Sequence, residues 1–159
     1  MSRGRVVLVA FAAAVSVAVL GGLATDIGPW YAALEKPPWK PSDAWFGPVW
    51  TLIFALTAMA AALSWWNSPD RVSRQNLLIW LSFNAMLNVG WSLLFFRLRR
   101  PDWALSEVAL LWLSIVILIW VCGKRSRLAG LLLLPYVAWV SFAAVLNLEI
   151  VRLNSPFGA

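Results

Sequence analysis

Histidine is absent from this chain of 159 residues, and cysteine occurs once, at Cys122. Without imidazole, the chain cannot form a His-ligated haem, a His-based zinc site or a Ser-His-Asp triad. A lone cysteine cannot close an internal disulfide and says little about the redox compartment. We therefore expect no metal site and no required cofactor, and any ligand must be held by aromatic rings, amides and backbone groups.

Charged residues are also scarce, at 13% of the chain, whereas hydrophobic residues make up 62% and the mean hydropathy is +0.77. A soluble domain carries about 25% charged and about 45–50% apolar residues. The excess apolar surface must face lipid, where only helices and closed barrels satisfy their own backbone hydrogen bonds. The apolar runs are about 19–24 residues long and do not alternate with polar residues, so they favour helices. The sequence predicts an all-α, multi-pass integral membrane protein.

The net charge of +6 arises from 13 basic and 7 acidic residues. The basic residues are dispersed over the termini and connecting loops, which favours contact with lipid headgroups over nucleic acid. Membrane lipid is therefore an expected partner, and nucleic acid is not. Seven basic residues lie on the side of the N-terminus and six on the other side, so the positive-inside rule does not orient the chain. Whether the membrane belongs to a bacterial cell envelope or an organelle stays open.

Five apolar segments predict five membrane-spanning helices in a single domain, 1–159. The spans are about 6–24, 45–66, 76–96, 103–122 and 128–151. The first also resembles a signal peptide, because Arg3 and Arg5 precede its apolar run. Its length favours a retained helix, as does a stripe of small residues that lets helices pack closely. That stripe consists of Ala10, Ala14, Ala18 and Gly22.

A long loop at about 25–44, rich in aromatic residues and proline, separates the first two spans. Proline fixes φ and lacks the backbone N–H, so residues 36–41 are neither the interior of a helix nor a paired strand. A stiff aromatic segment at a membrane surface favours a lid over a simple connector. The lid residues of interest are Trp30, Tyr31, Lys36, Pro37 and Lys40.

Two asparagines lie in the middle of the third span. Asn84, Asn88, Trp91 and Phe95 share one helical face at spacings of i, i+4, i+7 and i+11. Amides in the membrane are costly unless satisfied, so this face should point toward other helices or a cavity. Hydrogen bonding between helices and contact with a ligand both explain the pair. Similar faces hold Trp50, Phe54, Thr57 and Ala61 in the second span, and Trp139, Ala143 and Asn147 in the fifth.

Two acidic residues lie within the predicted spans. Glu107 is one turn into the fourth span, where we expect it to reach the surface or to pair with a loop arginine. Glu149 and Arg152 are three residues apart near the end of the fifth span, which predicts a local ion pair.

Three ordered motifs resemble those of the tryptophan-rich sensory protein/translocator protein family, also called the peripheral-type benzodiazepine receptor family. The first comprises Trp30-Tyr31, Lys36-Pro37-Pro38-Trp39 and Gly47-Pro48-Val49-Trp50-Thr51; the second, Asn88-Val89-Gly90-Trp91 with Phe95-Phe96; the third, Pro135-Tyr136-Val137-Ala138-Trp139 with Leu146-Asn147. The resemblance covers nearly the whole chain. It implies a five-helix bundle that forms a homodimer, with a pocket that opens toward the first loop and is covered by it.

The resemblance also implies a function. It suggests a membrane receptor or sensor that binds protoporphyrin-type tetrapyrroles as ligands and regulates tetrapyrrole level or a stress response. Alternatives are a light-dependent porphyrin-degrading catalyst, with Trp50 or Trp139 as electron donor, and a transporter of tetrapyrroles or sterols. Whether the protein is an enzyme is left open, although a conventional one is not expected. Carried over by motif, the pocket positions are Trp39, Trp50, Phe54, Asn88, Trp91, Ala138, Trp139 and Asn147.

The residues themselves also favour a flat aromatic ligand. Twelve tryptophans offer large apolar faces for stacking. Asn88 and Asn147 are suited to orient ring nitrogens or carbonyls. Lys36 and Lys40 are suited to meet the acidic groups of a porphyrin at the mouth of the pocket.

Four features depart from the family pattern. Phe54 replaces a tyrosine found in many members, so a hydroxyl contact is lost. The run from Pro41 to Trp45 lacks the usual proline pair, and its tryptophan is displaced by one position. Ser92-Leu93 stands where the third helix often carries two prolines, so a local kink is expected to be missing. Leu148 replaces an aromatic residue of the sterol-recognition motif, so sterol ranks below porphyrin as a ligand.

Overall fold

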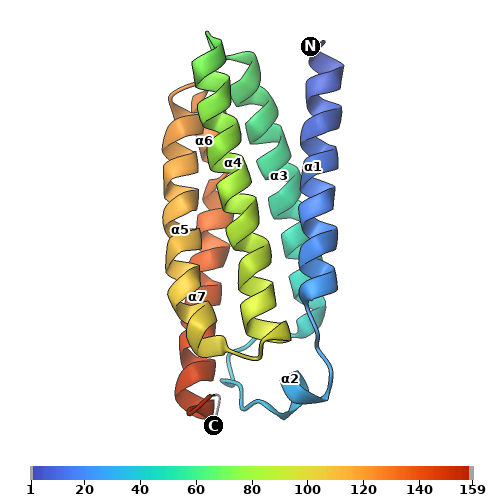
Figure 1. Ribbon diagram of the computed structural model, residues 1–159, viewed down its shortest axis with the longest axis vertical. Coiled ribbons are helices and arrows are strands. Elements are labelled where there is room, and N and C mark those ends of the chain that lie inside the picture. The colour runs from blue at the N-terminus through green and yellow to red at the C-terminus, as the bar shows by residue number, and fades with distance from the viewer. Residues whose placement is uncertain (1, 158–159) are drawn as a thin grey trace.

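The computed structural model describes residues 2–157 and shows five long helical segments side by side (Figure 1). Each is long and apolar enough to cross a membrane. The predicted all-α, five-span architecture is confirmed, and the outermost residues of the predicted domain 1–159 lie outside the described residues. The long helices are α1 (Arg3–Ala24), α3 (Phe46–Trp66), α4 (Arg71–Ser92), α5 (Pro101–Gly123) and α7 (Leu134–Asn154).

The ends of the helices are set by residues outside the apolar runs. The third span begins at Arg71, five residues before the predicted start, because the Asp70 carboxylate accepts a hydrogen bond from the backbone N–H of Ser73 at 2.7 Å. The first span begins at Arg3, where the Ser2 side chain forms the cap. The fourth begins at Pro101, because a proline in the first turn needs no hydrogen-bond partner.

The fifth span is not the single helix predicted over 128–151. A short helix, α6 (Arg127–Leu131), precedes α7, and Pro135 lies in the first turn of α7. Proline cannot donate the backbone hydrogen bond that a continuous helix requires, so the chain breaks just before it. Gly130 allows α6 to pack closely on α5, because a Cβ there would lie 3.0 Å from Gly123 Cα.

The end of the third span departs from regular α-helix even though it lacks the proline pair. A π-helical turn, η2 (Leu93–Arg97), continues α4. Its wider hydrogen bonding includes Leu98 N–H to Leu93 O at 2.9 Å. The expected absence of a kink at this point stays a prediction. The turn buries two adjacent rings, Phe95 and Phe96, whose centroids are 4.7 Å apart.

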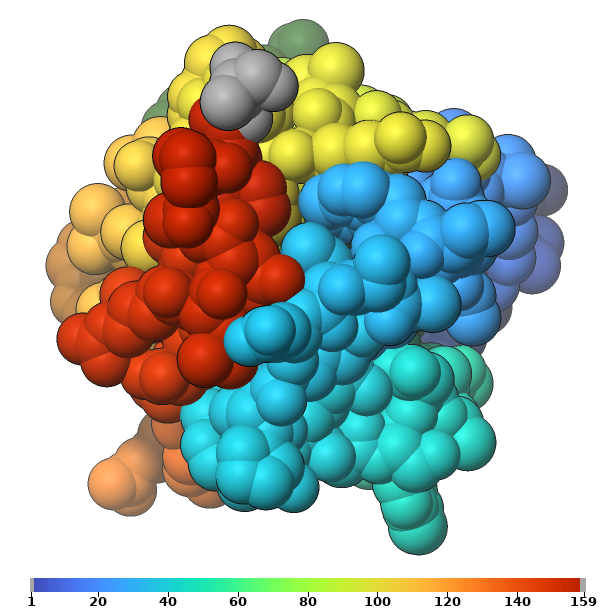
Figure 2. Space-filling view, turned by 90° about the horizontal axis from the view of Figure 1, so that it is seen from below, coloured from blue at the N-terminus to red at the C-terminus, as the bar shows by residue number. Residues whose placement is uncertain are grey.

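The loop at 25–44 lies across one end of the bundle, beside the C-terminal end of α7 and the α4–α5 turn (Figure 2). It contains a short helix, α2 (Pro29–Ala33), and ends in η1 (Asp43–Trp45). Residues 36–41 are neither helix nor strand, as predicted. The Asn154 side chain accepts a hydrogen bond from Glu35 N–H and donates one to Glu35 C=O, both at 2.8 Å. The lid is thereby fixed to the end of α7.

Candidate ligand-binding site

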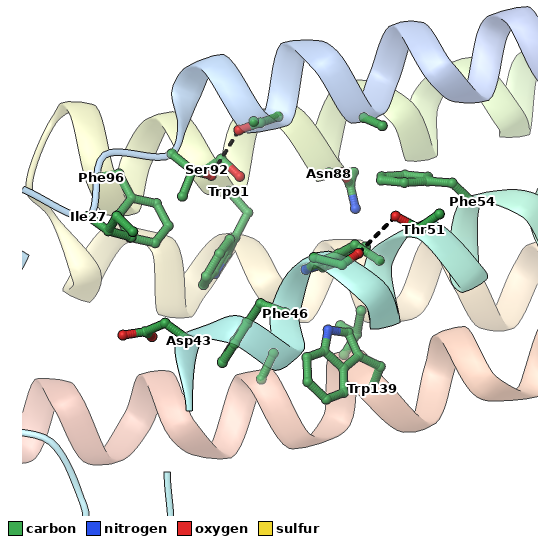
Figure 3. A pocket seen from close by; sticks show the side chains of 18 of the residues that line it. Ile27, Asp43, Phe46, Thr51, Phe54, Asn88, Trp91, Ser92, Phe96 and Trp139 are labelled. Atoms are coloured by element: carbon green, nitrogen blue, oxygen red, sulfur yellow. Dashed lines mark hydrogen bonds between the residues drawn. The ribbon is translucent and has the colours of Figure 1, made fainter. Parts of the chain in front are cut away.

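A cavity of about 440 Å³ lies beneath the lid, bordered by α1, α3, α4, α5 and α7. This volume falls in the range of small-molecule sites, about 300–1,000 Å³. Figure 3 shows that the side chains of Trp91, Phe46 and Trp139 converge on it from α4, α3 and α7. The aromatic residues of its wall are Tyr31, Phe46, Trp50, Phe54, Trp91, Phe96 and Trp139.

The cavity exists because α1 presents small residues to the bundle. Ala18, Gly21 and Gly22 line it opposite the rings of α3. The larger neighbours Leu20 and Leu23 are exposed and do not line the cavity, so they leave the space open. The small-residue stripe of the first span thus faces the other helices, as its composition predicted. At Ala18 and Gly22, however, the stripe borders a cavity.

Ring contacts hold the aromatic walls in fixed orientations. Trp50 stacks on Phe54 with centroids 5.4 Å apart and meets Tyr136 edge-on at 6.0 Å. Phe46 meets Trp139 edge-on at 5.4 Å. Such pairs contribute about 0.5–1.5 kcal/mol each beyond the burial of their area. The walls are therefore preorganised for a flat apolar ligand.

A buried chain of hydrogen bonds runs behind the rings. Asn88 Nδ2 donates to Tyr136 Oη at 3.0 Å, and that hydroxyl donates to Asn84 Oδ1 at 3.2 Å. Asn84 Nδ2 donates to Ser114 Oγ at 2.8 Å. Both asparagines therefore join α4 to neighbouring helices. Hydrogen bonding between helices is thus observed for both, and Asn88 also lines the cavity, where its contact with a ligand stays a prediction.

Two indole N–H groups on this wall are buried without hydrogen-bond partners among the described residues. They belong to Trp91 and Trp139. A buried donor left unpaired costs about 1–3 kcal/mol. A ligand that brought an acceptor atom to either indole would remove that cost, so both side chains favour a ligand with polar atoms at its rim.

A carboxylate of the lid lies at the mouth of the cavity and accepts hydrogen bonds from two other lid residues. Asp43 lines the cavity, and its Oδ1 accepts hydrogen bonds from Tyr31 Oη at 3.0 Å and Lys40 Nζ at 2.6 Å. Burial, together with the hydrogen bond to Asp43, raises the pKa of the Tyr31 hydroxyl, so this group stays a neutral donor.

The two lid lysines already have partners within the lid. Lys36 Nζ donates to the carbonyls of Tyr31 and Leu34 at the end of α2, and burial, followed by the nearby Lys40 charge, lowers its pKa. Lys40 pairs with Asp43. Their contact with acidic groups of a ligand stays a prediction, and it would require these partners to exchange.

Comparison with known proteins places the chain in a family. The sequence profile of the TspO/MBR family matches residues 7–153. The chain belongs to the TspO/MBR family. It is 40% identical to the tryptophan-rich protein TspO of Chlorobaculum tepidum over 129 residues, which are 79% of each chain. It is 31% identical to the human translocator protein over 126 residues, 79% of this chain and 75% of the relative. It is 30% identical to the tryptophan-rich sensory protein of Cereibacter sphaeroides over 125 residues, 79% of this chain and 77% of the relative.

Family membership confirms the resemblance carried by the three motifs and the multi-pass membrane localisation. The motifs fall on structurally distinct parts of the cavity. The first supplies part of the lid and the start of α3, the second lies on α4, and the third on α7. Of the eight motif-derived positions, the cavity is lined by Trp50, Phe54, Asn88, Trp91 and Trp139.

Three motif-derived positions do not line this cavity. Trp39 is 47% exposed and meets Phe142 edge-on at 5.8 Å. Ala138 is exposed on α7. Asn147 is buried, and with its amide oriented to satisfy both groups it bonds Pro101 C=O and Leu105 N–H at 3.1 Å each, which ties α7 to α5. A role in ligand binding stays a prediction for all three. Of the predicted lid residues, Tyr31 lines the cavity, whereas Trp30, Lys36, Pro37 and Lys40 do not.

Several lining residues escaped the motif comparison. Phe46 lies four residues before Trp50, and Ser92 lies four residues after Asn88, so each extends a predicted face by one helical turn. Those two could have been found from periodicity. Asp43 could not, because its position depends on the fold of the lid.

The expectation for Glu107 is wrong. Both carboxylate oxygens are buried and have no hydrogen-bond partner within residues 2–157. Because α5 begins at Pro101, Glu107 lies nearly two turns inside the helix, and the nearby Arg100 already pairs with Asp102. The carboxylate faces Gly90 of α4, where a Cβ would lie 4.0 Å from Glu107 Oε1, an ordinary contact distance. The predicted pair of Glu149 with Arg152 is confirmed at 2.7 Å.

Proposed function

We propose that this membrane protein is a receptor or sensor that binds a protoporphyrin-type tetrapyrrole beneath the lid. The observation that carries the proposal is the convergence of five motif-derived residues on one cavity walled by seven aromatic rings. A flat macrocycle has the shape for offset stacking against such walls. Relatives named as a sensory protein and a translocator protein support a receptor role in the membrane.

The polar groups of the site suit the same ligand. The unpaired N–H groups of Trp91 and Trp139 would donate to acceptor atoms of the macrocycle or its substituents. Asn88 would act at the inner end of the cavity, where its amide is already oriented by Tyr136. The porphyrin is a ligand in this proposal, and the protein requires no cofactor of its own. We also propose a homodimer, which the family resemblance implies.

The test is porphyrin titration of two matched double variants, followed by the absorbance of the bound pigment. Trp50→Phe/Trp139→Phe reduces the stacking area of two cavity walls. Trp103→Phe/Trp120→Phe makes the same chemical change at rings that are 53% and 60% exposed on the outer surface. We expect the cavity variant to bind roughly tenfold more weakly, about 0.7 kcal/mol for each contact, and the control to bind as wild type does.

Two results would contradict the proposal. One is wild-type affinity in the cavity variant, and the other is an equal loss in both variants. Illuminating the same samples tests the photochemical alternative, because Trp50 and Trp139, its candidate electron donors, both line the cavity. Porphyrin breakdown no faster than in detergent alone would reject that alternative.

A further inference from the structure

A second cavity, of about 420 Å³, occupies the opposite half of the bundle between α1, α3 and α4. Along α1 it extends from Val17 to Val6, eleven residues, which corresponds to roughly 16 Å at the helical rise. Phe54 and Asn88 border both cavities. The second cavity therefore runs from the middle of the membrane toward the side that carries the N-terminus. Most of its lining is aliphatic and includes Val6, Ala13, Val17, Leu77 and Leu81.

Two arginines stand where this cavity reaches the membrane surface. Arg3 is one helical turn before the lining residue Val6, and Arg74 is one turn before Leu77. The Arg74 guanidinium lies 5.3 Å from the centroid of Trp65, which also lines the cavity. The Arg3 guanidinium lies 5.9 Å from the neighbouring Trp66 ring. Both guanidinium groups thus gather around the last turn of α3.

The guanidinium group of Arg74 has few hydrogen-bond acceptors. Its Nη2 reaches Ser68 C=O only at 3.5 Å, and its Nε is buried with no partner in the described part of the chain. Leaving a buried charged donor unpaired costs more than leaving a neutral one unpaired. An acceptor at this position, and an anionic one above all, would satisfy the group.

The two sides of the molecule differ in how their charges are paired. All three ion pairs found among residues 2–157 lie on the lid side. The N-terminal side has one acidic residue, Asp70, whose carboxylate caps α4. The positive charge of the N-terminal side is therefore largely uncompensated by acidic residues of the protein. The basic residues there are Arg3, Arg5, Arg71, Arg74, Lys124, Arg125 and Arg127.

We propose that the second cavity binds an acyl chain of an anionic phospholipid whose phosphate is held by Arg3 and Arg74. The long aliphatic slot suits a hydrocarbon chain, and guanidinium groups bind phosphate oxygens through paired hydrogen bonds. Trp65 and Trp66 lie at the depth of the lipid headgroups, where tryptophan is favoured. The two cavities share Phe54 and Asn88, but this proposal does not rest on porphyrin binding.

The first test compares phosphatidylglycerol with phosphatidylcholine of identical chains. The protein is reconstituted with an equimolar mixture, extracted, and the retained lipid is measured by native mass spectrometry. Arg3→Gln/Arg74→Gln removes the proposed phosphate ligands, and Lys124→Gln/Arg127→Gln removes the same charge from the same side. We expect wild type and the control to retain phosphatidylglycerol preferentially. The Arg3/Arg74 variant should lose roughly twentyfold of that preference, because it loses charge-assisted hydrogen bonds to the phosphate.

The second test addresses the acyl chain with charges unchanged. Ala13 and Ala12 are both exposed, but only Ala13 lines the cavity, so Ala13→Phe places a ring there and Ala12→Phe does not. Only the first should reduce phosphatidylglycerol retention; circular dichroism checks folding, and Ala13→Leu replaces Ala13→Phe if needed. Glycerol 3-phosphate, which has no chain, should not compete.

The proposal would be overturned by equal retention of the two lipids, or by unchanged retention in the Arg3/Arg74 variant. It would also be overturned if filling the cavity had no effect, or if glycerol 3-phosphate competed as well as a short-chain phosphatidylglycerol. Competition of that kind would indicate a simple anion site on the surface.

Discussion

At the scale of single residues, polar side chains in the membrane fix the relative positions of the helices. Asn84 and Asn88 link α4 to Ser114 of α5 and Tyr136 of α7 through one hydrogen-bonded chain. Each amide would be costly in hydrocarbon without its partner. This hydrogen-bonded chain passes directly behind the cavity beneath the lid, so it sets the spacing between the walls that Trp91 and Trp139 provide.

A double-mutant cycle measures the strength of this link. Asn84→Ala combined with Ser114→Ala should show a coupling free energy of about 0.6 kcal/mol, because hydrogen bonds between membrane helices average that value. The measurement is reversible unfolding in mixed micelles. As a control, Asn84→Ala combined with Ser106→Ala, an exposed residue of α5, should be additive. Equal coupling in the two cycles would show that the Asn84–Ser114 bond does not carry it.

At the scale of elements, the lid is held by contacts in its middle and near its junction with α3. Asp43 connects Tyr31 and Lys40 at the mouth of the cavity, and Asn154 holds the backbone of Glu35 at the end of α7. Trp30 also meets Phe95 edge-on at 6.2 Å, and Tyr31 meets Phe96 at 5.5 Å. Entry or release of a ligand through the lid would require these contacts to open.

Asn154→Ala should loosen the lid without disturbing the cavity. It removes two hydrogen bonds to Glu35, about 1 kcal/mol each, so lid opening should become roughly thirtyfold more frequent at most. The measurements are hydrogen exchange at residues 34–40 and the rate of porphyrin release, both of which should rise. Asn67→Ala is the matched control, because Asn67 also lies at the end of a helix but bonds only its own helix, at Leu63 C=O. Unchanged exchange in Asn154→Ala would show that the lid is held elsewhere.

The elements also show what hydropathy predicts and what it misses. Five spans followed from the apolar runs, but their ends depend on caps such as Ser2 and Asp70, which lie outside those runs. Pro135 was a sequence signal for the break before α7. Hydropathy averaged over a whole span does not register a single proline. The π-helical turn that begins at Leu93 had no such signal, because residues 93–97 contain no proline.

At the scale of the whole molecule, helical periodicity predicted which residues face inward but not which cavity or neighbour they meet. Trp139 and Asn147 share a face of α7, yet Asn147 lies two turns further along and meets the start of α5. Glu107 shows the same limit, because its depth depends on where α5 begins. The second cavity could not be predicted either, since it arises from small residues on α1, α3 and α4 together.

The central claim, porphyrin binding beneath the lid, is tested most directly by locating a metalloporphyrin in crystals of the protein. Zinc protoporphyrin supplies an anomalous scattering signal that marks its position without reference to the surrounding density. We predict a single zinc peak within the first cavity, between Trp50, Trp91 and Trp139. A peak in the second cavity, or on the outer surface of the bundle, would contradict the claim.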